Sequence, residues 1–254
     1  CALEHLRDSF GLQYGYSVSW SFPVIYRVII TMLASIEHLI SAQNLIKIRQ
    51  LLNDSPFVDG KLSAGTVAKG VKNNQEMDPQ STHFNQLNEL VMGNLVRHPK
   101  FKAVVWPKRI AAPFYARYEP GMAYGEHVDD PIMGQGDLYR TDVSMTVFLS
   151  EPDEYDGGEL TIKDSYGERG IKLAAGSVVI YPSHSRHFVA PVTRGVRLVA
   201  VSWAQSTIRD PAQREMLYEL NQAREILYKE LPHSEATRKI SATFNNLVRR
   251  WVAL

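Results

Sequence analysis

The chain is poor in cysteine and carries little net charge. Its one cysteine is Cys1, so an intramolecular disulfide is impossible and a zinc site built on several thiolates is excluded. Such cysteine usage is typical of a reducing compartment, and we expect a cytoplasmic protein. The 28 Lys and Arg residues nearly balance 27 Asp and Glu residues, which leaves a net charge of +1. Because there is no basic stripe, we expect no nucleic-acid partner.

Long hydrophobic runs are also lacking. An apolar stretch at residues 22–33 is interrupted by Pro23 and Arg27 and is too short to span a bilayer. No basic segment precedes it, as a signal peptide would require. We therefore expect no stable membrane insertion, and a membrane anchor in this stretch is the alternative. Met32 would be a natural first residue, and we expect residues 1–31 to be an extension outside the recognisable domain.

Residues 32–100 contain two amphipathic patterns and predict a helical or mixed support region. In the first pattern, Ser41 is a candidate N-cap and apolar residues follow it at helical spacing. The second pattern begins near Ser81 and ends by His98, which precedes a proline. Both apolar stripes are expected to pack against a sheet.

Residues 101–206 change to short segments rich in β-branched and aromatic residues, separated by turns. The expected strands are residues 102–106, 110–118, 141–149, 160–163, 177–181 and 196–203. Many short strands without intervening helices favour an antiparallel sandwich or barrel. This region is therefore expected to be the β domain of the chain.

Residues 207–254 return to helical spacing and predict a C-terminal helical subdomain. We expect one helix over residues 210–230 and another over residues 234–252. The second has an apolar stripe made of Ile240, Phe244, Leu247 and Trp251. Such a stripe is buried against something. The partner is either the chain's own domain or a second subunit, and we favour a homo-oligomer in which part of the stripe packs internally.

His127 and Asp129 are separated by one residue, Val128. On a strand, residues i and i+2 point to the same face, so both side chains could reach one metal ion while Val128 packs on the other side. A third ligand is available in His187, which opens a strand-like segment. Two histidines and one carboxylate form the facial triad of non-heme Fe(II) oxygenases. His184 competes for the third place, but it lies in a polar turn.

Arg197 shares a face with Val199 and Val201 if residues 196–203 form a strand. A guanidinium on an interior face is costly unless an anion meets it, and its planar fork matches a carboxylate. We therefore expect Arg197 to bind a carboxylate ligand. A shifted register with an outward arginine, or an ion pair with another strand, is the alternative.

Five separated motifs resemble the bacterial PKHD-type hydroxylases, within the Fe(II)/2-oxoglutarate dioxygenases of the prolyl/lysyl-hydroxylase type. They are V-K-N-N-Q (71–75), R-Y-E-P-G-M-A-Y-G-E-H-V-D (117–129), R-T-D-V-S-M-T-V-F-L-S (140–150), Y-D-G-G-E-L (155–160) and P-V-T-R-G-V-R (191–197). The resemblance covers about Met32 to Leu254 and does not cover residues 1–31.

The resemblance implies a mainly β protein with flanking α helices, whose core is a double-stranded β-helix, or jelly roll. It implies that His127, Asp129 and His187 hold Fe(II), and that Arg197 holds the distal carboxylate of 2-oxoglutarate. The expected activity is hydroxylation of an unidentified substrate with O₂, while 2-oxoglutarate is decarboxylated to succinate and CO₂. Bacterial relatives also imply L-ascorbate binding and a link to iron uptake and iron homeostasis.

Tyrosines near the iron ligands line the ligand pocket in related hydroxylases, which suggests this place for Tyr118 and Tyr124. Core packing is the alternative for each. Asn73 and Asn74 could line the mouth of the pocket or make a turn, and we favour the turn. A cupin-like module that binds metal and anion as a sensor is the alternative to an enzyme. An AlkB-like nucleic-acid demethylase is disfavoured by the near-neutral charge.

Overall fold

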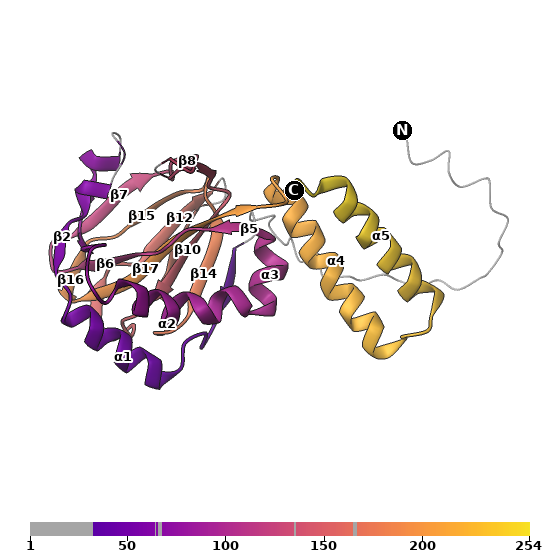
Figure 1. Ribbon diagram of the computed structural model, residues 1–254, viewed down its shortest axis with the longest axis horizontal. Helices are drawn as coiled ribbons and strands as arrows, with labels where there is room; N and C mark the ends of the chain where they lie inside the picture. The colour runs from indigo at the N-terminus through magenta and orange to yellow at the C-terminus, as the bar shows by residue number, and fades with distance from the viewer. Residues whose placement is uncertain (1–32, 64, 66–67, 135, 165–166) are drawn as a thin grey trace.

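The computed structural model describes residues 33–63, 65, 68–134, 136–164 and 167–254. The predicted extension at residues 1–31 lies outside the described residues. Among these residues, the strands form two main antiparallel sheets with helices around them (Figure 1). The predicted fold class, a jelly roll flanked by helices, is confirmed.

The first sheet has the strand order β1-β14-β10-β17-β6-β4-β2, and β5 also pairs with β17. Its strands are β1 (Ala34–Ile36), β2 (Phe57–Asp59), β4 (Gln75–Met77), β5 (Pro107–Ile110), β6 (Phe114–Tyr118), β10 (Val143–Phe148), β14 (Val178–Pro182) and β17 (Arg197–Ser206). The sheet therefore combines strands from the N-terminal region with strands from the predicted β domain.

The second sheet has the order β13-β12-β15-β7-β3. Its strands are β3 (Lys72–Asn73), β7 (Ala123–His127), β12 (Leu160–Asp164), β13 (Gly167–Ile171) and β15 (Arg186–Val189). Two small pairs complete the described strands: β8 (Ile132–Met133) with β9 (Tyr139–Arg140), and β11 (Tyr155–Gly157) with β16 (Val192–Gly195). Two short 3₁₀ helices are formed by Gly60–Ser63 and Ala68–Gly70.

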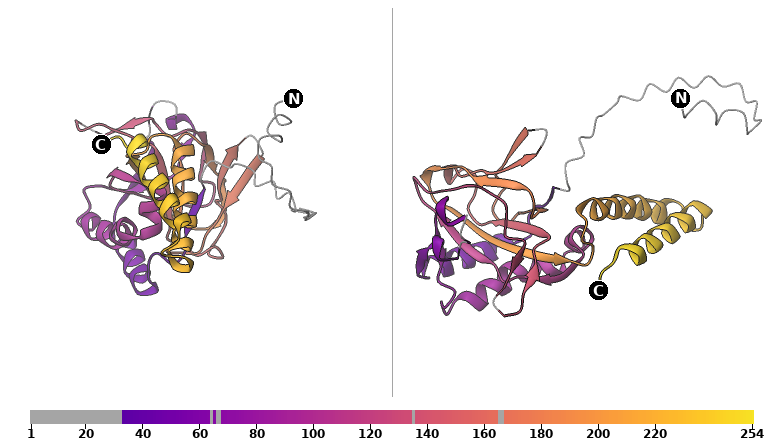
Figure 2. Two further views of the ribbon diagram at one scale, coloured as in Figure 1. Left: turned by 90° about the vertical axis from the view of Figure 1, so that its right-hand side faces the viewer. Right: turned by 90° about the horizontal axis from the view of Figure 1, so that it is seen from above.

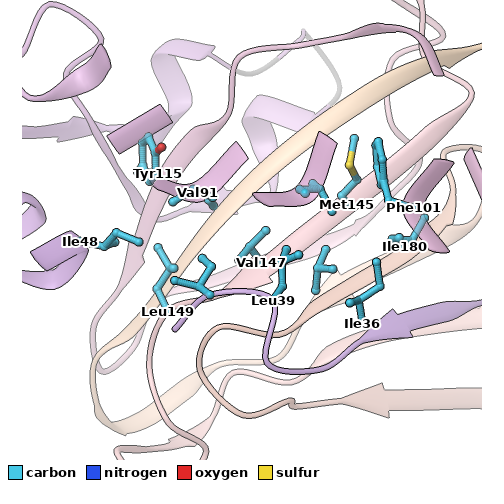
Figure 3. Packing of buried hydrophobic residues seen from close by; sticks show 14 of the residues in the cluster. Ile36, Leu39, Ile48, Val91, Phe101, Tyr115, Met145, Val147, Leu149 and Ile180 are labelled. Carbon is cyan, nitrogen blue, oxygen red and sulfur yellow. The ribbon is translucent and has the colours of Figure 1, made fainter. Parts of the chain in front are cut away.

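Helices α1 (Ala42–Asn53), α2 (Phe84–Arg97) and α3 (Pro99–Val105) lie along the outer face of the first sheet (Figures 1 and 3). Their apolar residues, such as Ile48 and Val91, belong to one buried cluster with Met145 and Val147 of β10 (Figure 3). As predicted, Ser41 caps α1, and its hydroxyl accepts a hydrogen bond from the Asn44 backbone N–H. The helices thus cover one face of the sheet and leave its other face to the second sheet.

Side chains of strand β17 alternate between two apolar cores, one between the helices and the first sheet and one between the two sheets. Leu198 and Ala200 point to the helices, whereas Val199 packs in the core between the two sheets. Arg197, two residues before Val199, is 1% exposed. The alternation of the sequence therefore predicts its interior position correctly.

The prediction of a strand at residues 102–106 is wrong, because these residues belong to α3 and its C-cap. Pro99 occupies the first helical turn, and the His98 side chain accepts a hydrogen bond from the backbone N–H of Lys100. These helix-start signals outweigh the β propensity of Val104 and Val105, which are buried on one side of the helix. The strand predicted at residues 110–118 is also divided, between β5 and β6.

The C-terminal helices α4 (Pro211–Glu230) and α5 (Glu235–Trp251) form an antiparallel pair that projects from the jelly roll (Figures 1 and 2). Asp210 and Ser234 are their N-caps, and they are the residues at which the two helices were predicted to begin. Part of the predicted stripe packs within the chain, since Phe244 is 7% exposed and its ring centroid lies 6.2 Å from that of Trp106. In the described part of the chain, no helix is both long and apolar enough to cross a membrane.

Candidate metal and cosubstrate site

His127 and His187 lie opposite each other as register partners in the second sheet, on β7 and β15. Asp129 follows β7, and its Oδ1 atom lies 3.8 Å from Nε2 of His127 and 3.8 Å from Nε2 of His187. The three ligand atoms all lie within 4.8 Å of one another. The structure therefore brings together the three residues that the sequence predicts as metal ligands.

The strand expectation holds only for His127, where β7 ends. Asp129 lies in the following loop, and Val128 is 45% exposed instead of packed against the opposite side. Because the chain leaves the sheet after His127, the Asp129 side chain is not fixed by strand alternation and points toward the imidazoles. The competing His184 is exposed and does not belong to the three-residue cluster.

Both imidazoles are oriented by hydrogen bonds to the backbone. Nδ1 of His127 lies 2.9 Å from the Gly125 carbonyl oxygen, and Nδ1 of His187 lies 2.9 Å from the Ser185 carbonyl oxygen. A carbonyl oxygen can only accept, so each Nδ1 carries the hydrogen and each Nε2 keeps a lone pair. This arrangement is typical of metal-binding histidines.

Asp129 is oriented by a hydrogen bond, and His127 is held in the neutral form that can bind a metal. The Ser144 hydroxyl donates to Oδ2 of Asp129, so Oδ1 remains available on the side of the imidazoles. Burial, and then the nearby His187, lower the pKa of His127 to about 4. His127 is therefore neutral near pH 7, and its ring is stacked on Tyr124 with centroids 3.8 Å apart. Two imidazole nitrogens and one carboxylate oxygen fit a divalent transition metal such as Fe(II).

Arg197 is a buried charged side chain that lines the same cavity as the metal ligands. Among the described residues it has no ion-pair partner, and its Nε and Nη1 atoms lack hydrogen bonds although they are buried. Its register partner on β6 is Tyr118, whose ring centroid lies 4.9 Å from the guanidinium carbon. A buried arginine without a counter-charge is a costly arrangement that a bound carboxylate would relieve. The site therefore fits 2-oxoglutarate.

A cavity of about 930 Å³ connects these groups. Its lining includes the three candidate ligands, Arg197, the two tyrosines and a polar group from the N-terminal region; these residues are Lys72, Asn74, Glu76, Tyr118, Tyr124, His127, Asp129, His187 and Arg197. Both tyrosines thus lie at the cavity, as suggested for them. The N-terminal region therefore contributes to the candidate site as well as to the outer support.

The expectation of a turn at Asn73 and Asn74 is wrong, because Asn73 belongs to β3 and Asn74 lies between β3 and β4. Asn73 is exposed, whereas Asn74 is 4% exposed and lines the cavity. Residues 72, 74 and 76 are buried and the residues between them are more exposed, but all five are polar, so the sequence carries no alternation that could have revealed this burial.

Two protein-family models match the chain. The one described as "2OG-Fe(II) oxygenase superfamily" matches residues 113–205, and the one described as "PKHD-type hydroxylase C-terminal domain" matches residues 211–253. A PKHD-type hydroxylase of Thioalkalivibrio sulfidiphilus is 52% identical over 221 residues, which cover 87% of this chain and 99% of the relative. A PKHD-type hydroxylase of Thermosynechococcus vestitus is 42% identical over 224 residues, which cover 88% of this chain and 100% of the relative.

A solved structure of a prolyl hydroxylase from Trichoplax adhaerens, in complex with a hypoxia inducible factor oxygen degradation domain peptide fragment, is also similar. The TM-score is 0.51 at 14% sequence identity, and the match covers 72% of this chain and 86% of that chain. At this identity the likeness shows the fold alone, which agrees with the two antiparallel sheets of the jelly roll.

Proposed function

We propose, because the chain belongs to the PKHD-type hydroxylases of the 2OG-Fe(II) oxygenase superfamily, that His127, Asp129 and His187 hold its Fe(II) and Arg197 its 2-oxoglutarate. The protein is a hydroxylase of the 2OG-Fe(II) oxygenase type. One observation carries the assignment of the residues. In a single cavity, three converging metal ligands lie together with a buried arginine that has no counter-charge among the described residues.

The three ligands occupy one side of a metal ion and leave positions open for other ligands. When bound, the metal and the ketoacid supply the oxygen chemistry: one atom of O₂ is inserted into a C–H bond of the substrate, and the other oxidises 2-oxoglutarate to succinate and CO₂. The protein's own groups bind and orient these reactants. Backbone carbonyls and Ser144 hold the ligands in place.

Arg197 and Tyr118 are proposed to bind the distal carboxylate of 2-oxoglutarate. The guanidinium supplies a permanent charge at the buried end of the cavity, and the neighbouring tyrosine supplies a hydroxyl group. Burial raises the pKa of Tyr118, and Arg197 opposes this shift in second place. Tyr118 therefore remains a neutral hydrogen-bond donor near pH 7 and does not repel the dianionic cosubstrate.

The experiment that tests this function is turnover without added substrate. The protein is loaded with Fe(II) under anaerobic conditions, O₂ and 2-oxoglutarate are added, and succinate is measured. We expect slow succinate formation that disappears in His187→Ala. A protein that binds iron and 2-oxoglutarate but forms no succinate under any condition would favour the cupin-like sensor.

Finer properties remain predictions. We propose that L-ascorbate supports turnover by keeping the iron reduced, and that the activity is linked to iron uptake. A cytoplasmic location and a homo-oligomer formed through the C-terminal helices are proposed on the sequence grounds given above.

A further inference from the structure

Lys72, Asn74 and Glu76 form a polar wall on one side of the active-site cavity. The three residues alternate with Asn73 and Gln75 along an extended segment, and their exposed fractions are 7%, 4% and 7%. All three line the cavity that contains the candidate metal ligands and Arg197. Three consecutive inward positions with polar side chains are unexpected for a hydrophobic core, because polar groups are costly to bury.

Asn74 lies at the point where the two sheets separate. On one side of it, Lys72 pairs with Tyr124 of β7, which belongs to the sheet of the metal ligands. On the other side, Glu76 pairs with Ala116 of β6, which belongs to the sheet of Arg197. Asn74 therefore lies between a strand of the sheet that carries the metal-binding histidines and a strand of the sheet that carries Arg197, and it lines the cavity that these residues share.

The Asn74 amide is buried, and neither Oδ1 nor Nδ2 has a hydrogen-bond partner among the described residues. Its surroundings fix its direction. Oδ1 faces Gly60, where an added Cβ would collide with it. Asn74 and Tyr118 line the same cavity, and an interaction with the Asn74 side chain lowers the pKa of Tyr118. Because Oδ1 is directed at Gly60, Nδ2, which carries two hydrogens, is the amide atom that remains available to a ligand or to Tyr118.

The flanking charges are satisfied, in contrast to the amide. Lys72 Nζ lies 2.6 Å from Glu76 Oε1 and 2.9 Å from the Ser63 hydroxyl. Because these two charges neutralise each other, the wall presents no net charge to an anionic ligand. Among these three residues, Asn74 is thus the one whose side-chain polar atoms have no hydrogen-bond partner among the described residues.

We propose that Asn74 is a 2-oxoglutarate-binding residue, whose amide nitrogen donates one hydrogen to the bound ketoacid and the other to the Tyr118 hydroxyl. This role rests on the proposed function, in which Tyr118 and Arg197 bind the same molecule. It gives the buried amide a partner in the liganded protein. It also explains the glycine at position 60, because a residue without a Cβ leaves room for Oδ1 of Asn74.

The test is Asn74→Leu, which keeps the approximate size of the side chain and removes both polar atoms. Binding of 2-oxoglutarate is measured by calorimetry in the presence of Mn(II), which supports no oxygen chemistry, and melting is measured without ligand. We expect 2-oxoglutarate to bind about 10- to 100-fold more weakly, as for the loss of a hydrogen bond to a charged group. The ligand-free protein should melt at the same or a higher temperature, because an unsatisfied buried amide has been removed.

The matched control is Asn73→Leu, on the neighbouring residue whose side chain is exposed, and it should leave 2-oxoglutarate affinity unchanged. Asn74→Asp should bind 2-oxoglutarate more weakly than Asn74→Leu, because a carboxylate would repel the dianion. If Asn74→Leu fails to fold, Gly60→Ala displaces the amide from behind, and it should weaken 2-oxoglutarate binding.

Unchanged 2-oxoglutarate affinity in Asn74→Leu or, if that variant does not fold, in Gly60→Ala overturns the inference. A lower melting temperature of the ligand-free Asn74→Leu protein overturns it also, since the amide would then be a structural group. Arg197→Ala separates this failure from failure of the proposed function. If Arg197→Ala weakens 2-oxoglutarate binding and Asn74→Leu does not, only the role of Asn74 is wrong; if neither does, the cosubstrate site itself is misplaced.

Discussion

Ser144 donates a hydrogen bond to Oδ2 of Asp129 and is itself 2.8 Å from the Ser183 hydroxyl. The bond comes from β10 of the first sheet, whereas the two histidines come from the second sheet. The only acidic member of the metal cluster is thus fixed by the sheet opposite to its partners. Closure of the jelly roll, and not the H-x-D spacing alone, therefore sets the geometry of the site.

Ser144→Ala should weaken Fe(II) binding about 10- to 100-fold, because residues that orient metal ligands typically contribute this much. The carboxylate would lose the donor that turns Oδ1 toward the imidazoles. Metal titration under anaerobic conditions measures the effect. Ser177→Ala is the control, since the Ser177 hydroxyl is equally buried but has no hydrogen-bond partner in the described part of the protein. Equal metal affinities in the two variants would contradict the orienting role of Ser144.

His187→Ala and Asp129→Ala should abolish turnover and strongly weaken iron binding, whereas His184→Ala should be nearly silent. His187 and Asp129 belong to the three-residue cluster, and Asp129 is its anionic member. His184 lies three residues away from His187 but is exposed. Iron content after dialysis and succinate formation provide the two readouts. If loss of His184 and not of His187 removed the iron, the ligand assignment would be wrong.

Arg197→Ala should raise the 2-oxoglutarate concentration needed for half-maximal turnover by more than tenfold and leave iron affinity nearly intact. Removing one partner of a buried, hydrogen-bonded charge pair costs about 2–5 kcal/mol. Arg194→Ala is the control, because Arg194 is largely exposed and pairs with Asp156 at the surface. A cosubstrate dependence that is unchanged in Arg197→Ala would mean that the carboxylate binds elsewhere.

Local signals in the sequence were sufficient for much of the fold. Ser41, Asp210 and Ser234 cap the helices that they were predicted to begin, because capping depends on the chain within a few residues. The alternation in β17 likewise places Arg197 in the interior. Helix capping and strand alternation can both be recognised within a single helix or strand, without knowledge of the rest of the fold.

Other features depend on contacts between distant segments and could not be predicted. His127 pairs with His187 on strands β7 and β15, and between these two strands the chain also forms β10 and β14 of the other sheet. No local pattern sets this register. Asp129 reaches the site from a loop, where alternation carries no information. For Asn74 no alternation is visible in the sequence, because residues 72–76 are all polar, and the burial of this residue follows from the cavity beside it.

Phe244 belongs to the apolar cluster of the C-terminal pair, α4 and α5. The Phe244 ring packs near Trp106, and the Arg224 guanidinium carbon lies 4.0 Å from its centroid. Phe244→Ala should therefore destabilise the protein by about 3–5 kcal/mol, as for other buried phenylalanines, and Phe244→Glu should disrupt the helix pair without yielding an active, well-folded monomer. Thermal melting measures both effects.

Self-association requires a different surface, because Phe244 is already covered within its own chain. On α4, Met216 and Ile226 are 52% and 54% exposed, and side chains of this kind are available to a second copy. The double variant Met216→Glu/Ile226→Glu should leave the melting temperature nearly unchanged and convert an oligomeric parent to monomers by light scattering. It should also leave turnover without substrate unchanged, since the candidate site lies in the jelly roll. A monomeric parent protein would refute the association, and an oligomer that persists in the double variant would place its interface on another face.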